Sequence, residues 1–276
     1  MKTASDMPET RPGQDLRRVS ARLPLAGLRT IFALMLREMA SSHGRLAGGY
    51  LWTVLQPLMA ITLLSVIFSL GFRNPRLGTN FAIYYATGML PYAFALTVSD
   101  KMAGAIGYSR ALLGYPRVTF TDVIAARLLL HVLTQLVVTS LALSGIRMAW
   151  DTQTTAELPV ILETYAMALV LGAGVGALNC FLFAMFPLWE RAWSLFTRPL
   201  FFVSGVLFIY ETFPEPYRGW IWYNPLMHVT GSMRSAFYYG YDAAYVSPAY
   251  VFAIGMACLA LWLLLLRRYH RDIREM

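Results

Sequence analysis

Aromatic residues and arginines are the side chains of this chain that are best suited to chemistry, because acidic groups are nearly lacking within its apolar stretches. Tyrosine and tryptophan rings stack on sugar rings through their apolar faces and form hydrogen bonds through their polar tips. A water-filled translocation path for a carbohydrate could therefore be lined by these residues: Tyr84, Tyr85, Tyr92, Trp189, Trp193, Trp220, Trp222 and Tyr223. The alternative for each of them is the ordinary aromatic belt at a membrane interface.

Several other chemistries are excluded by the residues that they would need. A phosphate-binding P-loop requires a lysine followed by serine or threonine, but Lys2 has no room for a preceding loop and Lys101 is followed by Met102. The four histidines are scattered, and neither the HExxH spacing nor a Cys/His metal cluster occurs. A GxSxG nucleophile motif is also missing. We therefore expect no metal, no catalytic residue and no ATP on this chain.

Long apolar stretches must position these side chains. The chain has 276 residues, of which 57% are hydrophobic and 14% charged. A helix of about 20 apolar residues crosses a bilayer. The sequence predicts an all-α membrane protein with six transmembrane helices, at about residues 50–71, 81–103, 123–145, 164–187, 191–210 and 246–266. Residues 25–276 form one membrane domain, and 1–24 a flexible cytoplasmic tail.

The net charge of +8 is distributed unevenly along the chain. Most lysines and arginines lie on one side of the expected spans, including Arg267 and Arg268 after the last span. By the positive-inside rule that side is cytoplasmic, so both termini are cytoplasmic. The basic charge thus reflects membrane orientation, and no nucleic-acid partner is expected. The two cysteines, Cys180 and Cys258, lie in apolar stretches and indicate no disulfide framework.

Three segments depart from simple spans. Residues 25–43 repeat apolar residues with helical spacing and predict an amphipathic helix in the interface plane, either a membrane anchor or a docking helix. Residues 107–122 form a cytoplasmic elbow that contains a short helix, Ser109–Leu113. After a short fifth span, the prolines and dense aromatics of 210–250 predict two short re-entrant helices around Trp220–Thr230, in the outer leaflet.

Arg127 and His131 lie four residues apart within the third span, on one helical face. Charges at membrane depth are costly and usually face protein or a water-filled path. Arg127 is near the cytoplasmic end, so it could also pack or snorkel to the interface.

This order of elements resembles the membrane subunits of ABC-2 type exporters, with their type V fold. The resemblance rests on Gly44-Arg45, Trp52 and Gln56-Pro57 at the entry to the first span, and it covers residues 25–270. Residues 111–131 (ALLGYPRVTFTDVIAARLLLH) and 222–241 (WYNPLMHVTGSMRSAFYYGY) are similar to the capsular polysaccharide exporters of Gram-negative bacteria.

The resemblance implies a homodimeric permease in the bacterial inner membrane, bound to two copies of a separate ABC nucleotide-binding subunit that carries ATP and Mg. The substrate would be a lipid-linked acidic polysaccharide, with a periplasmic co-polymerase as a further partner. By resemblance the substrate path would also include Arg37, Arg45, Trp52, Arg191 and Arg198, with Arg127 and Arg234 as weaker candidates. Contacts with the ATPase subunit would come from Arg29, Arg37, Ser109, Arg110, Leu112, Leu113, Tyr115, Pro116 and Arg117.

Other functions stay open at this point. The same fold exports O-antigen, teichoic acid, other lipid-linked substrates and drugs. An intramembrane transferase would need a cluster of His, Asp or Glu at one depth, and a secondary transporter would show inverted repeats. We find neither pattern in the sequence.

Overall fold

The computed structural model describes residues 26–42, 49–105 and 120–275. These residues form helices without any strand: α1 (Ala26–Ser42), α2 (Gly49–Gly71), α3 (Phe81–Ala103), α5 (Phe120–Ala149), α6 (Leu158–Met185), α7 (Pro187–Val203), η1 (Tyr210–Thr212), α8 (Tyr217–Trp222), α9 (Pro225–Phe237) and α10 (Pro248–Glu275). The expected tail, Arg45 and residues 107–119 of the expected elbow 107–122 lie outside the described residues, and the last three residues of the elbow belong to α5. The prediction of an all-α protein is confirmed for the part of the chain that is described.

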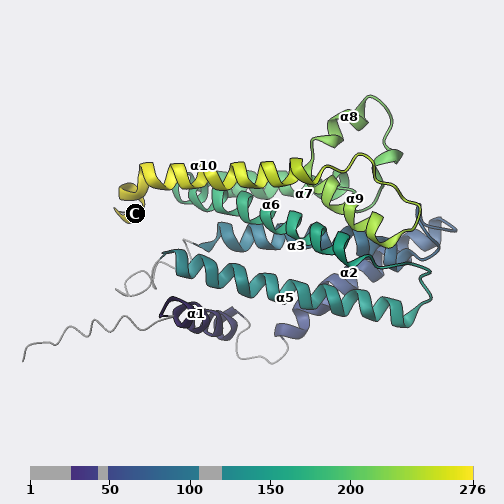
Figure 1. Cartoon of the computed structure of the whole chain (residues 1–276), viewed down its shortest axis with the longest axis horizontal. Coiled ribbons are helices and arrows are strands. Elements are labelled where there is room, and N and C mark those ends of the chain that lie inside the picture. The colour runs from purple at the N-terminus through teal and green to yellow at the C-terminus, as the bar shows by residue number, and fades with distance from the viewer. Residues whose placement is uncertain (1–25, 43–48, 106–119, 276) are drawn as a thin grey trace, which may run out of the picture.

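Five of these helices, α2, α3, α5, α6 and α10, are long and apolar enough to cross a membrane. They run along one another in Figure 1. Helix α1 and the C-terminal part of α10 lie toward one end of this bundle, and α9 lies toward the other end. The helix start of α3 is fixed by Asn80, whose side chain accepts hydrogen bonds from the backbone N–H groups of Ala82 and Ile83. Gly104 follows its last turn as the C-cap.

The fifth expected span, over residues 191–210, differs most from the prediction in its position and length. It covers Pro187–Val203 instead, and its 17 residues do not qualify it as one of the five candidate spans. It ends because Gly205 adopts φ +76°, which glycine reaches without steric cost. Two short helices, α8 and α9, follow where the sequence predicted them.

α3 and α6 form the centre of the molecule, and α6 lies between α3 and α10. Glycines explain this position. A Cβ added at Gly172 or Gly176 would stand 2.5 Å from a backbone oxygen of α3, and one added at Gly174 would collide with the backbone of Gly255 in α10. Since residues 172 and 176 share a helical face that 174 does not, α6 offers close contact on two sides.

α2 and α7 are the exposed helices of the single chain. The candidate span in α2 is only 6% buried, and no residue of α7 is buried. Both therefore have large surfaces that another molecule or lipid can cover.

Candidate substrate-path and coupling sites

α7 carries a polar face. Arg191 and Arg198 are seven residues apart, lie on one helical face and are exposed. Trp189 and Trp193 lie on another face, with ring centroids 6.4 Å apart, and Trp189 Nε1 donates to Asn179 Oδ1 of α6 at 3.0 Å. The two tryptophans thus face the neighbouring helices, whereas the two arginines face away from them.

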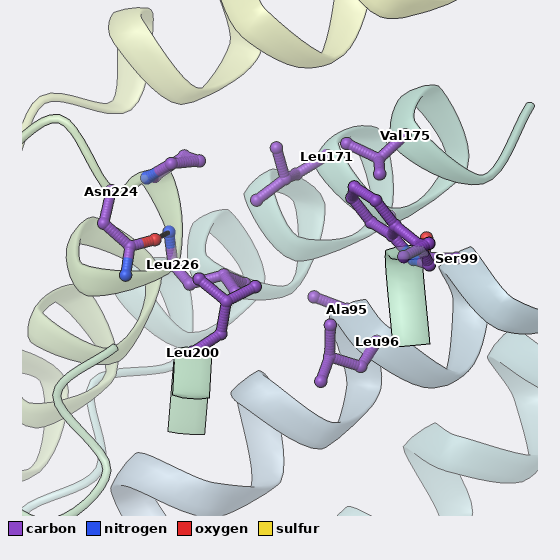
Figure 2. Close-up of a pocket in the computed structure, with 11 residues that line it drawn as sticks. Ala95, Leu96, Ser99, Leu171, Val175, Leu200, Asn224 and Leu226 are labelled. Carbon is purple, nitrogen blue, oxygen red and sulfur yellow. Dashed lines mark hydrogen bonds between the residues drawn. The ribbon is translucent and has the colours of Figure 1, made fainter. Parts of the chain in front are cut away.

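A pocket of about 210 Å³ lies where α7 meets α3, α6 and the start of α9. It is lined by Ala95, Leu96, Ser99, Leu171, Gly172, Val175, Trp193, Leu200, Asn224, Pro225 and Leu226. Figure 2 shows Ser99 and Val175 at one end and Asn224 and Leu226 at the other. The lining is almost wholly apolar, so the pocket suits hydrocarbon rather than sugar.

Three tyrosines that the sequence suggested for a wet path lie instead in the core of the single chain. Tyr84, Tyr85 and Tyr92 are 1%, 2% and 7% exposed. Tyr84 donates to the carbonyl of Leu207 at 3.1 Å and contacts the ring of Tyr85 edge-on. In this structure they pack helices together, and a substrate would reach them only after the helices rearrange.

Arg234 of α9 is also covered, with 1% exposure. Its Nη2 donates to the carbonyl of Val206 at 3.0 Å and its Nη1 to that of Phe208 at 3.2 Å. Its guanidinium lies 4.4 Å from the centre of the Tyr84 ring, a cation–π contact. Arg234 therefore holds the irregular backbone that follows α7.

The aromatic residues of α8, with Tyr223 at its C-cap, form a separate group beside α9 and the start of α10. Trp220 and Tyr223 are 80% and 69% exposed, whereas Trp222 packs on His228 and Tyr250. Trp52 of α2 is 56% exposed. The predicted aromatic path residues thus divide into buried and exposed sets and do not line one cavity.

The ring of His228 is held between two backbone groups. Nε2 lies 2.7 Å from the carbonyl of Trp222, and Nδ1 accepts from the N–H of Ser247 at 3.1 Å. This assigns the neutral form with its proton on Nε2. Burial lowers the pKa of His228 below its ordinary value of 6.5, and the hydrogen bond to Trp222 partly opposes this shift.

A pH dependence follows from this depressed pKa. The neutral ring stabilises the junction of α8, α9 and α10 above pH 6.5, and this contribution is lost as the pH falls through the lower folded-state pKa. We expect the unfolding midpoint of the detergent-solubilised chain to fall between about pH 7 and pH 5, and His228→Gln to flatten this dependence. An equal slope in the variant would show that His228 does not cause it.

At the opposite end, Arg127 of α5 forms a buried ion pair with Glu38 of α1. Arg127 Nη2 and Nε each lie 3.1 Å from Glu38 Oε1, and Nη1 donates to the carbonyl of Gly104 at 3.2 Å. Packing, rather than snorkelling, accounts for this arginine. Glu38 could not be predicted as a partner of Arg127, because only the fold brings residues so far apart in the chain together.

The expected ATPase contacts are described only in part. Arg29 and Arg37 are exposed on α1. The other candidates, Ser109, Arg110, Leu112, Leu113, Tyr115, Pro116 and Arg117, lie outside the described residues. Among the residues described, no three His, Cys, Asp or Glu side chains are grouped in a way that could hold a metal ion.

Comparison with known proteins identifies the class. The profile of the ABC-2 type transporter family matches residues 29–238, so the chain belongs to this family, and the resemblance seen in the sequence is confirmed.

Named relatives are similar over most of the chain. The polysialic acid transport protein KpsM of Escherichia coli is 28% identical over 238 residues, which cover 86% of this chain and 92% of KpsM. The capsule polysaccharide export inner-membrane protein CtrC of Neisseria meningitidis serogroup A is 23% identical, and BexB of Haemophilus influenzae is 22% identical. Each of these two alignments covers 89% of this chain and 92% of the relative.

Proposed function

We propose that this chain is the membrane-spanning permease subunit of an ATP-driven exporter that moves capsular polysaccharide across the bacterial inner membrane. The observation that carries this proposal is the alignment, over 86–89% of the chain, with proteins named for polysialic acid or capsule polysaccharide export. It is a transport subunit rather than an enzyme, and ATP is hydrolysed on a separate ABC subunit. A homodimer with two such subunits is the expected assembly.

The substrate is a lipid-linked acidic polysaccharide. α7 supports this because it combines two chemistries. Its exposed arginines, Arg191 and Arg198, suit anionic groups. Its other side lines the apolar pocket through Trp193 and Leu200, and this pocket suits a hydrocarbon chain. Exposed charges on a membrane helix face protein or water rather than lipid, so the arginine face of α7 is suited to the path. In this proposal α7 is the fifth of six spans and flanks the path together with α2.

Both termini lie in the cytoplasm in this proposal, and α8 and α9 are re-entrant helices at the outer side, where an export partner in the periplasm meets the chain. The end of α10 and helix α1 lie toward one end of the bundle in Figure 1, as an even number of spans requires. Most basic residues of the sequence also belong to that side.

The proposal is tested by deletion and co-purification in the native host. Deleting the gene should abolish surface polysaccharide, and a tagged chain that restores it should carry a separate ATP-hydrolysing polypeptide through purification in detergent. Removing residues 109–117 should release that polypeptide. Normal surface polysaccharide in the deletion strain, or a functional chain that purifies without an ATPase, would refute the function.

Replacing both path arginines of α7 should lower export. Hydrogen bonds to charged groups contribute about 1.5–3 kcal/mol each, so Arg191→Ala combined with Arg198→Ala should reduce surface polysaccharide by about tenfold or more at equal protein level. Arg147→Ala is the matched control, because Arg147 is also exposed but lies at the outer end of α5. Normal export in the double variant would remove both arginines from the path.

A further inference from the structure

Helix α1 is attached to the membrane helices by a small contact. Met35 packs with Ala126 and Leu130 of α5 in a cluster that is separate from the main core, with Ile31 and Leu34 at its edge. The opposite side of α1 stays open: Phe32 and Leu36 are 61% and 51% exposed. So few apolar contacts leave the rotation of α1 on α5 weakly fixed by packing alone.

The ion pair between Glu38 and Arg127 fixes the rotation of α1 on α5. Both side chains are buried, with 7% and 10% exposure. Buried ion pairs are poor sources of stability, because their desolvation offsets their attraction, and their best-attested use is to fix register. Only one rotation of α1 brings Glu38 to Arg127, so the pair selects which face of α1 remains free.

Arg127 also reaches a third element. Its Nη1 donates to the carbonyl of Gly104, the residue that caps α3. One guanidinium thus joins α1, which precedes the first span, the cytoplasmic end of α3, and the first turns of α5. The chain between Gly104 and α5 is the elbow that the proposed function assigns to the ATPase contact.

We propose that Arg127 is a positioning residue that couples ATP hydrolysis to export, by holding α1, the end of α3 and the start of α5 as one unit. This rests on the proposed function. A push by the ATPase on α1 or on the elbow is then delivered to both α3 and α5, instead of being absorbed by movement between them. Without Arg127 the ATPase still binds and hydrolyses ATP, but its motion reaches the spans incompletely.

The first test replaces the pair with apolar residues, Glu38→Met together with Arg127→Met, in the complete complex with its ATPase subunit. Such a swap removes both charges of the pair together and often preserves folding. We expect the ATPase to co-purify and to hydrolyse ATP within about twofold of wild type, while surface polysaccharide falls by about tenfold or more. Normal export by this variant would overturn the proposal, and so would a proportional loss of ATPase binding, hydrolysis and export.

The second test, Arg127→Lys, separates the ion pair from the three-way junction and serves if the apolar variant does not fold. Lysine keeps the charge but is a point donor without the fork of arginine, so it cannot serve Glu38 and Gly104 in the same way. Export per ATP hydrolysed should again fall at unchanged ATPase recovery. Wild-type export in this variant would show that the link to Gly104 carries no coupling.

Glu215→Ala is the matched control, because it breaks the exposed Arg218–Glu215 pair of 3.5 Å at the outer end. It should leave the ratio of export to hydrolysis unchanged, and an equal drop would overturn a specific role for Arg127. If the wild-type chain itself brings down no ATPase, the proposed function fails. If the wild-type complex works and the Arg127 variants couple normally, only the present inference fails.

Discussion

Substituting Gly174 with valine is expected to prevent the chain from accumulating in a folded form. The position is a close contact between α6 and α10, where even the Cβ of alanine would meet the backbone of Gly255. Backbone atoms cannot move aside like the end of a flexible side chain, so the two helices must separate. Overpacking typically costs 1–3 kcal/mol, and more where backbone must shift, while a whole domain is stable by only about 5–15 kcal/mol.

The measurement is the yield of monodisperse protein after detergent extraction, with the unfolding midpoint of whatever is recovered. Gly145→Val in α5 is the matched control, because nothing lies within 4 Å of a Cβ added there. Its yield should remain near wild type. Equal yields for the two valine variants would show that α6 and α10 do not depend on this close approach.

The apolar stretches of the sequence were sufficient to predict most of the membrane helices. α2 and α3 begin and end within one residue of the expected spans. Their ends are marked by residues with local effects, such as Asn80, which caps α3, and Gly71. By contrast, α7 ends at Val203, seven residues before Tyr210, where the sequence predicted its end. Hydropathy continues through Phe208, whereas the break at Gly205 depends on Arg234 and Thr230, which come later in the chain.

The roles of individual residues were less predictable than the helices. Tyr84 and Arg234 were both predicted as candidates for the substrate path, but the sequence does not show that they contact each other. A tyrosine that stacks on an arginine in the core and one that lines a path have the same local sequence. Glu38 and Arg127 illustrate the same limit, because an ion pair between two helices depends on how those helices dock. Local patterns therefore predicted the elements, and long-range contacts decided which side chains are accessible.

Arg234→Met should disrupt the packing of α9 against the backbone that follows α7, and abolish most export. Methionine is unbranched and fills the space of the aliphatic part of arginine, but it has no guanidinium and donates no hydrogen bond to the carbonyls of Val206 and Phe208. Leaving a buried group unsatisfied costs about 1–3 kcal/mol, and here two carbonyls and a cation–π contact with Tyr84 are lost together. The backbone after α7 then loses two of its hydrogen bonds, and α9 loses one of its contacts with α3.

Arg218→Met is a closely matched control for this prediction. Arg218 likewise donates to two backbone carbonyls, those of Phe213 and Glu211, but its side chain is 36% exposed. Water can replace its hydrogen bonds, so the loss should be small. We expect Arg234→Met to lower the unfolding midpoint by several degrees and to make residues 204–216 sensitive to added protease, with Arg218→Met close to wild type. If the two variants behave alike, burial does not decide the importance of Arg234, and its carbonyl contacts are dispensable. If Arg234→Met instead keeps wild-type stability and loses only export, Arg234 acts on the substrate, as a path residue would.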